Sequence, residues 1–265
     1  MRVGLPAGAL GRTEGTWHAL REYSIAPGAA LRYRRPCDAP TLIVGYVEAG
    51  TYAVRAVGPL EVIRGGDGAV PGARIAVEAG TEVVLERGDG LVYRVAPGED
   101  RSGFRNPGPG GLLVLEWVWW GEAACPLGRV EDAPPENMRP RWDNFGVSPP
   151  LDPTQALTLR FRRIAAGPGA VLPEAGPEGA GVLPGHAAGM ELLVVTEGRV
   201  ASSVRKGPGE AASSEVVFVP HHGVAGTEDL PAGMSRVLRN AGDGPLVLVA
   251  LTITPDEGAG TPAAG

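Results

Sequence analysis

The residues of this chain that could carry metal or nucleophilic chemistry are few and scattered. There are four histidines and two cysteines among 265 residues. Cys37 and Cys125 are too far apart in the sequence for a zinc knuckle, so we interpret them as two inert thiols. No serine or cysteine stands in a recognisable nucleophile motif, and no glycine-rich loop carries a lysine that would hold a phosphate. The sequence therefore disfavours nucleophilic catalysis and phosphate binding.

Two histidines are adjacent, at His221 and His222, directly after the expected strand Glu215 to Val219. A transition metal needs several nitrogen and oxygen donors, and two ligands alone hold one poorly. We interpret the pair as part of a polar loop. Two alternatives stay open, in which one histidine completes a metal site or contacts a ligand without a metal.

Three tryptophans, Trp117, Trp119 and Trp120, close the expected strand Leu112 to Trp119. Alternation along a strand puts Trp117 and Trp119 on one face and Trp120 on the other. We expect both faces to be covered, one by the core and one by a neighbouring domain. A stacking platform for a sugar or a base is the functional alternative.

The elements that position these residues are short strands. With 41 glycines, 26 prolines and 5% aromatic residues, the composition is typical of many strands joined by tight turns. Turn signals and partial alternation predict a barrel or sandwich. The strands expected in the first half are Thr41 to Val47, Thr51 to Val57, Arg74 to Val77, Thr81 to Glu86, Leu91 to Val95 and Leu112 to Trp119. Those expected in the second half are Leu157 to Ile164, Met190 to Val195, Arg199 to Val204, Glu215 to Val219, Ser235 to Leu238 and Leu246 to Ile253.

An internal repeat orders these strands into two domains. The frame Arg105 to Leu115 recurs as Arg239 to Val249, and Ile25 to Leu31 is echoed by Ile164 to Leu172. Such self-similarity indicates a duplicated β domain. We expect Asn106 to correspond to Asn240 in the two copies.

The predicted boundaries are a barrel at 15–121, a Pro-rich linker at 122–154, a second barrel at 155–256 and a flexible tail at 257–265. The linker is too rich in proline for a helix or a central strand. Trp142 and Phe145 indicate that it lies against the domains.

Charge and hydropathy exclude several partners. A net charge of −6 gives no basic footprint for nucleic acid and no polybasic segment for a membrane surface. No apolar run has the length of a signal peptide or a membrane span. We expect a cytoplasmic protein that binds neither nucleic acid nor membrane.

At its repeats the chain resembles the cupin superfamily, and specifically the two-domain bicupins, which implies two tandem all-β jelly-roll barrels. In the second repeat Glu191 and Gly198 match the first family motif, and His186 stands in its second-histidine slot. Asn240 fits the second motif, in which Arg236 replaces the histidine.

The first repeat departs further from the family pattern. Ile43 stands in its glutamate slot and Ser102 in its histidine slot. The family's metal site uses three histidines and a carboxylate, so we expect no metal in this repeat. Ile43 is expected to help fill the interior.

The resemblance leaves three functions open. The leading hypothesis is a metal-poor bicupin that binds a small molecule or has a structural or regulatory role, with no cofactor. The rival is a metal-dependent enzyme of the dioxygenase, isomerase or decarboxylase type, using Mn, Fe, Zn or Ni at His186, Glu191 and His221 or His222. The third is a scaffold whose barrels are filled by side chains. The residues expected to bind a ligand are His186, Glu191, Arg236, His221 and His222.

Arg236 sharpens the leading hypothesis, because in the family's geometry its slot and that of Glu191 both face the barrel interior. The guanidinium either pairs with Glu191 in place of a metal or binds a small anionic ligand such as a carboxylate. The two repeats are also expected to pack on each other, with the tryptophan-rich strand near that contact.

Overall fold

The fold is built from strands and turns. In the computed structural model the described residues are 1–10, 16–34, 41–65, 72–95, 102–121, 129–131, 137–147, 152, 154–172, 190–206, 215–220, 223–224 and 234–255. None of these residues is helical, which agrees with the expected all-β class. Within these ranges no helix is long and apolar enough to cross a membrane.

The chain divides into two compact units, Met1–Ala156 and Leu157–Gly265. The first contains β1 (Arg2–Leu5), β2 (Thr16–Ile25), β3 (Ala30–Arg34), β4 (Thr41–Ala49), β5 (Thr51–Arg55), β6 (Leu60–Arg64), β7 (Ala73–Val77), β8 (Glu82–Glu86), β9 (Gly90–Val95), β10 (Gly103–Arg105), β11 (Leu112–Gly121), β12 (Arg129–Glu131) and β13 (Met138–Val147). The second contains β14 (Leu157–Ala166), β15 (Met190–Glu197), β16 (Val200–Lys206), β17 (Val216–Phe218), β18 (Gly223–Val224), β19 (Met234–Asn240) and β20 (Leu246–Pro255).

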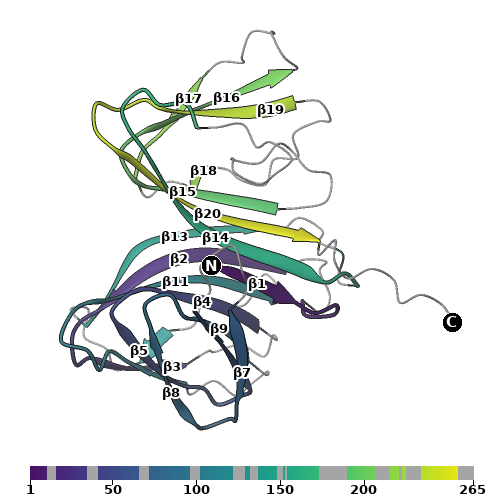
Figure 1. Ribbon diagram of the computed structural model, residues 1–265, viewed down its shortest axis with the longest axis vertical. Coiled ribbons are helices and arrows are strands. Elements are labelled where there is room, and N and C mark those ends of the chain that lie inside the picture. Colours follow the sequence, from purple (N-terminus) through teal and green to yellow (C-terminus); the bar gives the residue numbers. More distant parts are fainter. Residues whose placement is uncertain are drawn as a thin grey trace, which may run out of the picture. The chain divides into compact units, whose positions relative to one another are not determined.

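Two antiparallel sheets enclose the core of the first unit. One has the strand order β13-β2-β11-β4-β9-β6-β7, and the other has the order β12-β3-β10-β5-β8. The core cluster takes side chains from both sheets, among them Tyr23, Val114 and Leu91 from the first and Tyr52 and Leu85 from the second. Figure 1 shows β3, β5 and β8 facing the larger sheet. The interior of this unit therefore lies between two layers of strands.

The second unit repeats this two-sheet plan with fewer described strands. The strands of this unit lie in the orders β14-β20-β15-β18 and β17-β16-β19. Their facing sides meet in an apolar cluster that includes Leu193, Leu248 and Ala250 from one sheet and Val200 and Leu238 from the other. In Figure 1, β16, β17 and β19 lie together on one side of this unit, opposite β15 and β20.

A buried asparagine ties strand ends together in each unit. The side-chain amide of Asn106 donates to the carbonyls of Ile25 and Gly110, at 3.0 and 2.8 Å, and its oxygen accepts from the Gly108 amide at 3.0 Å. Asn240 donates to the carbonyls of Ala166, Gly167 and Gly244, at 3.2, 3.0 and 2.8 Å, and accepts from the Gly242 amide at 2.9 Å. The two asparagines therefore have corresponding local geometry.

The register corrects the upstream echo seen in the sequence. Gly28 and Gly169 both adopt a positive φ, of 72° and 70°. The backbone amide of Asn106 donates to Ala29, and that of Asn240 donates to Ala170. Gly169, which follows Ile164 by five positions, thus stands where Gly28 stands, so the match of Ile25 with Ile164 is two residues out of register. The echo sets seven residues against nine, and the match at its other end, of Leu31 with Leu172, has the register that Gly28 and Gly169 share.

The segment expected to be a linker contributes strands to the first unit instead. β12 pairs with β3, and β13 pairs with β2 at the edge of the larger sheet. The ladder between β13 and β2 shifts register between Pro140 and Trp142. Proline lacks an N–H donor, and an edge strand with an irregularity accommodates it. Prolines in this segment therefore did not prevent a strand.

The tryptophans of β11 are buried. The side chains of Trp117 and Trp119 are 0% and 2% exposed, and their ring centroids lie 5.6 Å apart. Trp120 belongs to the core cluster between the two sheets. Buried rings do not form an open platform for a sugar or a base. The expected packing of the two repeats through this strand stays a prediction.

Candidate functional site

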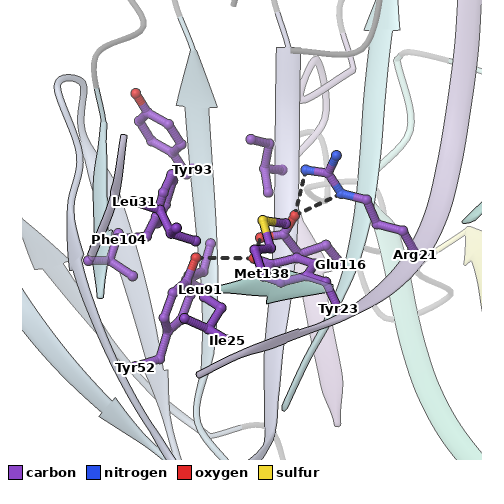
Figure 2. A pocket seen from close by; sticks show the side chains of 12 residues that line it. Arg21, Tyr23, Ile25, Leu31, Tyr52, Leu91, Tyr93, Phe104, Glu116 and Met138 are labelled. Carbon is purple, nitrogen blue, oxygen red and sulfur yellow. Dashed lines mark hydrogen bonds and ion pairs between the residues drawn. The ribbon is translucent and has the colours of Figure 1, made fainter. Parts of the chain in front are cut away.

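A cavity of about 110 Å³ lies between the two sheets of the first unit. Most of its wall is hydrocarbon, from side chains such as Ile25, Leu31, Val54 and Leu91. Because strand residues alternate between faces, the side chains that line it come from every second position of β2, β5 and β9. Figure 2 shows Leu31 and Leu91 on the side of the cavity away from Glu116 and Arg21, which form its polar end.

The polar end is organised around Glu116, a carboxylate in the otherwise apolar middle of β11. Glu116 faces Arg21 directly across the β11–β2 ladder. The Nε and Nη2 atoms of Arg21 donate to its Oε2, at 3.1 and 2.7 Å. The hydroxyl of Tyr23 donates to its Oε1. This buried carboxylate is therefore neutralised by a guanidinium and bonded at both oxygens, as a charge inside a protein requires.

A second tyrosine extends the chain of bonds into the cavity. The hydroxyl oxygens of Tyr23 and Tyr52 are 3.1 Å apart. The Tyr52 ring stacks on Phe104, with centroids 5.8 Å apart and an interplanar angle of 15°. Burial, and then the charge of Glu116, raise the pKa of both tyrosines well above the usual range. Both phenols thus keep their protons at neutral pH.

The two positions that occupy the family's ligand slots in this unit are both inside. Ile43 is buried in the core cluster and lines the cavity, as the sequence predicted. Ser102 is fully buried and shares a 3.0 Å hydrogen bond with the hydroxyl of Tyr93. Figure 2 shows the Tyr93 hydroxyl pointing away from the bond between Tyr23 and Tyr52.

These residues do not fit a divalent metal. The cavity offers one carboxylate, and both of its oxygens are already bonded to Arg21 and Tyr23. A metal in this place would have to displace a guanidinium and would find neutral phenols as its other donors, whereas transition metals need several nitrogen or carboxylate ligands. Within the described ranges, no three histidine, cysteine, aspartate or glutamate residues are grouped to hold an ion.

The residues predicted to bind a ligand lie in the second unit, of which the structure describes only some residues. His186, His221 and His222 lie outside the described residues. Glu191 is placed by its backbone in β15, opposite Thr252 of β20. Arg236 is placed by its backbone in β19, opposite Val204 of β16. The two positions thus belong to different sheets of this unit, and the pairing of their side chains stays a prediction.

The polar chain of the first unit has no counterpart at the corresponding positions of the second. Relative to the shared asparagine and glycine frames, Glu116 corresponds to Ala250, Tyr52 to Val200 and Tyr23 to Ile164. Ala250 and Val200 are fully buried in the apolar cluster, and Ile164 packs against it. The candidate site is therefore a property of the first unit.

Sequence reasoning missed Arg21, Tyr23, Tyr52 and Glu116. The signal that was available is Glu116 itself, because a single carboxylate interrupts the apolar run from Leu112 to Trp120. A charge at an inward position of a buried strand needs a partner. The partner is found only through the register that sets β2 beside β11.

The strand layers and the asparagine closures define an all-β protein of two units with corresponding strand ends, which is the fold class that the resemblance to the cupins implied. No protein-family model matches the sequence, and the search of curated proteins returns no match.

Several solved structures show some likeness to the chain. The chain is similar to the protein YhaK from Escherichia coli, with 14% identity over 96% of this chain and 93% of that one and a TM-score of 0.38. It is similar to a mutant of Bacillus subtilis oxalate decarboxylase, with 12% identity over 91% and 69% and a TM-score of 0.39. The formate complex of Lactobacillus farciminis oxalate decarboxylase shares 12% identity over 90% and 78%, with a TM-score of 0.38. All three TM-scores are below 0.5, so these likenesses carry no argument about the site or the function.

Proposed function

We propose that the first unit binds a small, uncharged organic molecule in the cavity between its sheets. The observation that supports this proposal is the cavity itself. Its wall is mostly apolar, and a series of hydrogen-bonded polar groups lies at one end. An apolar pocket with a few convergent polar groups is the usual form of a small-molecule site. This proposal corresponds to the leading hypothesis from the sequence, a metal-poor protein of the bicupin type that binds a small molecule.

The size of the cavity limits the ligand to a few heavy atoms. Its volume of about 110 Å³ is smaller than the roughly 150 Å³ of an engineered cavity that holds benzene. Short-chain alcohols, ketones and amides have suitable dimensions. A whole sugar or nucleoside would not fit within this volume.

The charge balance at the polar end favours a neutral ligand. Glu116 and Arg21 neutralise each other, so the cavity offers no unbalanced charge from this pair. Among the described residues that line the cavity, Arg21 is the only cation, so a ligand carboxylate would bring a second anion close to Glu116 without a compensating charge. The desolvation of that charge would oppose binding.

The proposal is tested by ligand-observed NMR titration and isothermal titration calorimetry with the full chain. We expect 1-butanol and 2-butanone to bind, and butyrate at the same pH not to bind. The variant Ile43→Phe places a larger side chain in the cavity and should abolish binding of both neutral probes. As a matched control, Ile164→Phe alters the interior of the second unit and should leave binding unchanged.

Two results would contradict the proposal. One is butyrate binding as tightly as 1-butanol. The other is unaltered binding of the neutral probes to a folded Ile43→Phe variant.

A further inference from the structure

At the polar end of the cavity, the donor and the acceptor of each hydrogen bond can be assigned, beginning with Glu116. A carboxylate that receives two N–H bonds from one guanidinium is ionised and can only accept. The Tyr23 hydroxyl must therefore be the donor in its bond to Oε1 of Glu116. Its single hydrogen is used in that bond.

This assignment determines the donor in the hydrogen bond between Tyr23 and Tyr52. A hydroxyl has one hydrogen and two lone pairs. Since the hydrogen of Tyr23 points to Glu116, the bond between Tyr23 and Tyr52 can form only if Tyr52 donates, across 3.1 Å. Tyr52 has then used its own hydrogen as well. What its hydroxyl can still offer to the cavity is a lone pair.

We propose that Tyr52 is the group that recognises the ligand and that it accepts a hydrogen bond from it, so the ligand is a small alcohol and not a ketone or an ether. This inference rests on the proposed function and narrows its ligand class. The acceptor is held in place, because the Tyr52 ring is buried and stacked on Phe104. Figure 2 shows its hydroxyl at the inner end of the chain that leads through Tyr23 to Glu116 and Arg21.

Beyond Tyr23 and Tyr52, the side-chain oxygens of the cavity wall belong to Tyr93 and Glu116, and both groups are already bonded. Tyr93 shares its hydroxyl with Ser102 and points away from Tyr52. Glu116 has both oxygens bonded. A ligand hydroxyl that enters the cavity therefore meets the oxygen of Tyr52 as its acceptor, and its carbon skeleton meets Ile25, Val54 and Leu91.

The experiment compares 2-butanol with 2-butanone, which have nearly the same shape and differ in that only the alcohol can donate. In the native protein we expect the alcohol to bind about tenfold more tightly, which corresponds to roughly one neutral hydrogen bond. Tyr52→Phe should reduce the affinity for 2-butanol to about that for 2-butanone. This substitution removes only the hydroxyl oxygen of Tyr52 and keeps its ring stacked on Phe104.

A second variant tests the direction of the bonds and not only the presence of Tyr52. In Tyr23→Phe the hydroxyl of Tyr52 loses its acceptor, and its hydrogen becomes available to a ligand. The affinity for 2-butanone should then rise and the tenfold preference for the alcohol should disappear. A role limited to packing would not produce this change. If Tyr23→Phe does not fold, Glu116→Gln serves the same purpose, because its amide can donate to Tyr23 and reverse the chain.

The outcomes separate this inference from the proposed function. Binding of neither probe to the native protein overturns both. Equal or tighter binding of 2-butanone to the native protein overturns the inference and leaves the proposed function standing. A preference for the alcohol that survives in Tyr52→Phe overturns it as well.

Discussion

At the scale of single residues, the first unit buries several titratable side chains. Glu116 and Arg21 form a pair inside the cavity wall, and His18 is buried on the same strand as Arg21. His18 stands opposite Trp119 of β11 and Gly146 of β13. Burial lowers the pKa of His18 from 6.5 to about 4. The stability of the protein should therefore depend on pH through this residue.

The sign follows from which state binds the proton first. As the pH falls from 6.5 towards 4, the unfolded chain protonates His18 and the native state does not. The contribution of His18 is thus fully present above pH 6.5 and is lost as the pH falls through this window, to a limit of about 3 kcal/mol. Urea unfolding at pH 7.5, 6, 5 and 4 measures it. In His18→Gln this part of the pH dependence should be absent, and equal slopes for both proteins would contradict the prediction.

Residue roles were predictable from the sequence only where a motif fixed a position. The slots of Ile43 and Ser102 followed from motif spacing, and both residues are interior. Tyr23 and Tyr52 carry no such signal, because aromatic residues in alternating strands are typical of any β core. Their meaning depends on Glu116, which lies 93 positions from Tyr23. Local sequence does not show which distant residues a register brings together.

At the scale of elements, the turns that lead from β4 to β5 and from β15 to β16 each connect the two sheets of a unit, and both contain a glycine with the same backbone angle. Gly50 and Gly198 both have a φ of 81°. A Cβ on Gly50 would lie 2.8 Å from the Gly111 carbonyl oxygen, and one on Gly198 would lie 2.3 Å from that of Pro245. Each turn therefore requires both the left-handed conformation and the missing side chain.

Gly50→Ala should lower the free energy of unfolding of the first unit by about 3 kcal/mol or more, from backbone strain together with the steric clash. Gly80 is the matched control, because its φ is 79° and nothing lies within 4 Å of its Cβ position. Gly80→Ala should lower the free energy by only about 1–2 kcal/mol. Urea denaturation of both variants measures the difference. Equal effects would show that the close approach to Gly111 does not matter.

The strands themselves were predictable to a large extent. Alternation and turn residues placed β4, β5, β8, β9 and β11 within a few residues, and most strands of the second unit likewise. β2 and β13 were missed for different reasons. β2 mixes polar, charged and apolar residues because both of its faces are covered, with Glu22 fully buried on one face and Tyr23 on the other. β13 contains Pro140, which is compatible with a strand only at an edge.

At the scale of the whole molecule, the two units share a plan but differ in their interiors. The first encloses a cavity with a polar end, and the described interior of the second is hydrocarbon at the corresponding positions. The metal-dependent alternative therefore depends on the second unit, through His186, Glu191 and His221 or His222.

Elemental analysis of the full chain, purified without chelator or nickel resin, tests whether a metal is bound. Variants in each unit then show which unit binds it. We expect no stoichiometric transition metal, and we expect Glu116→Gln to leave the metal content unchanged because Arg21 and Tyr23 already occupy that carboxylate. A stoichiometric metal that disappears in His186→Ala would favour the enzyme alternative. A metal that disappears in Glu116→Gln would show that the first unit holds it.

The asparagine closures also bear on how such a protein can change over evolutionary time. Asn106 and Asn240 bond only to backbone amides and carbonyls. Backbone carbonyls are present in every residue, so the closure places almost no demand on the side chains around it. Mutations can then accumulate in the interior of one unit without loosening its strands. One chain can in this way keep one interior as plain hydrocarbon while selection reshapes the other for a ligand.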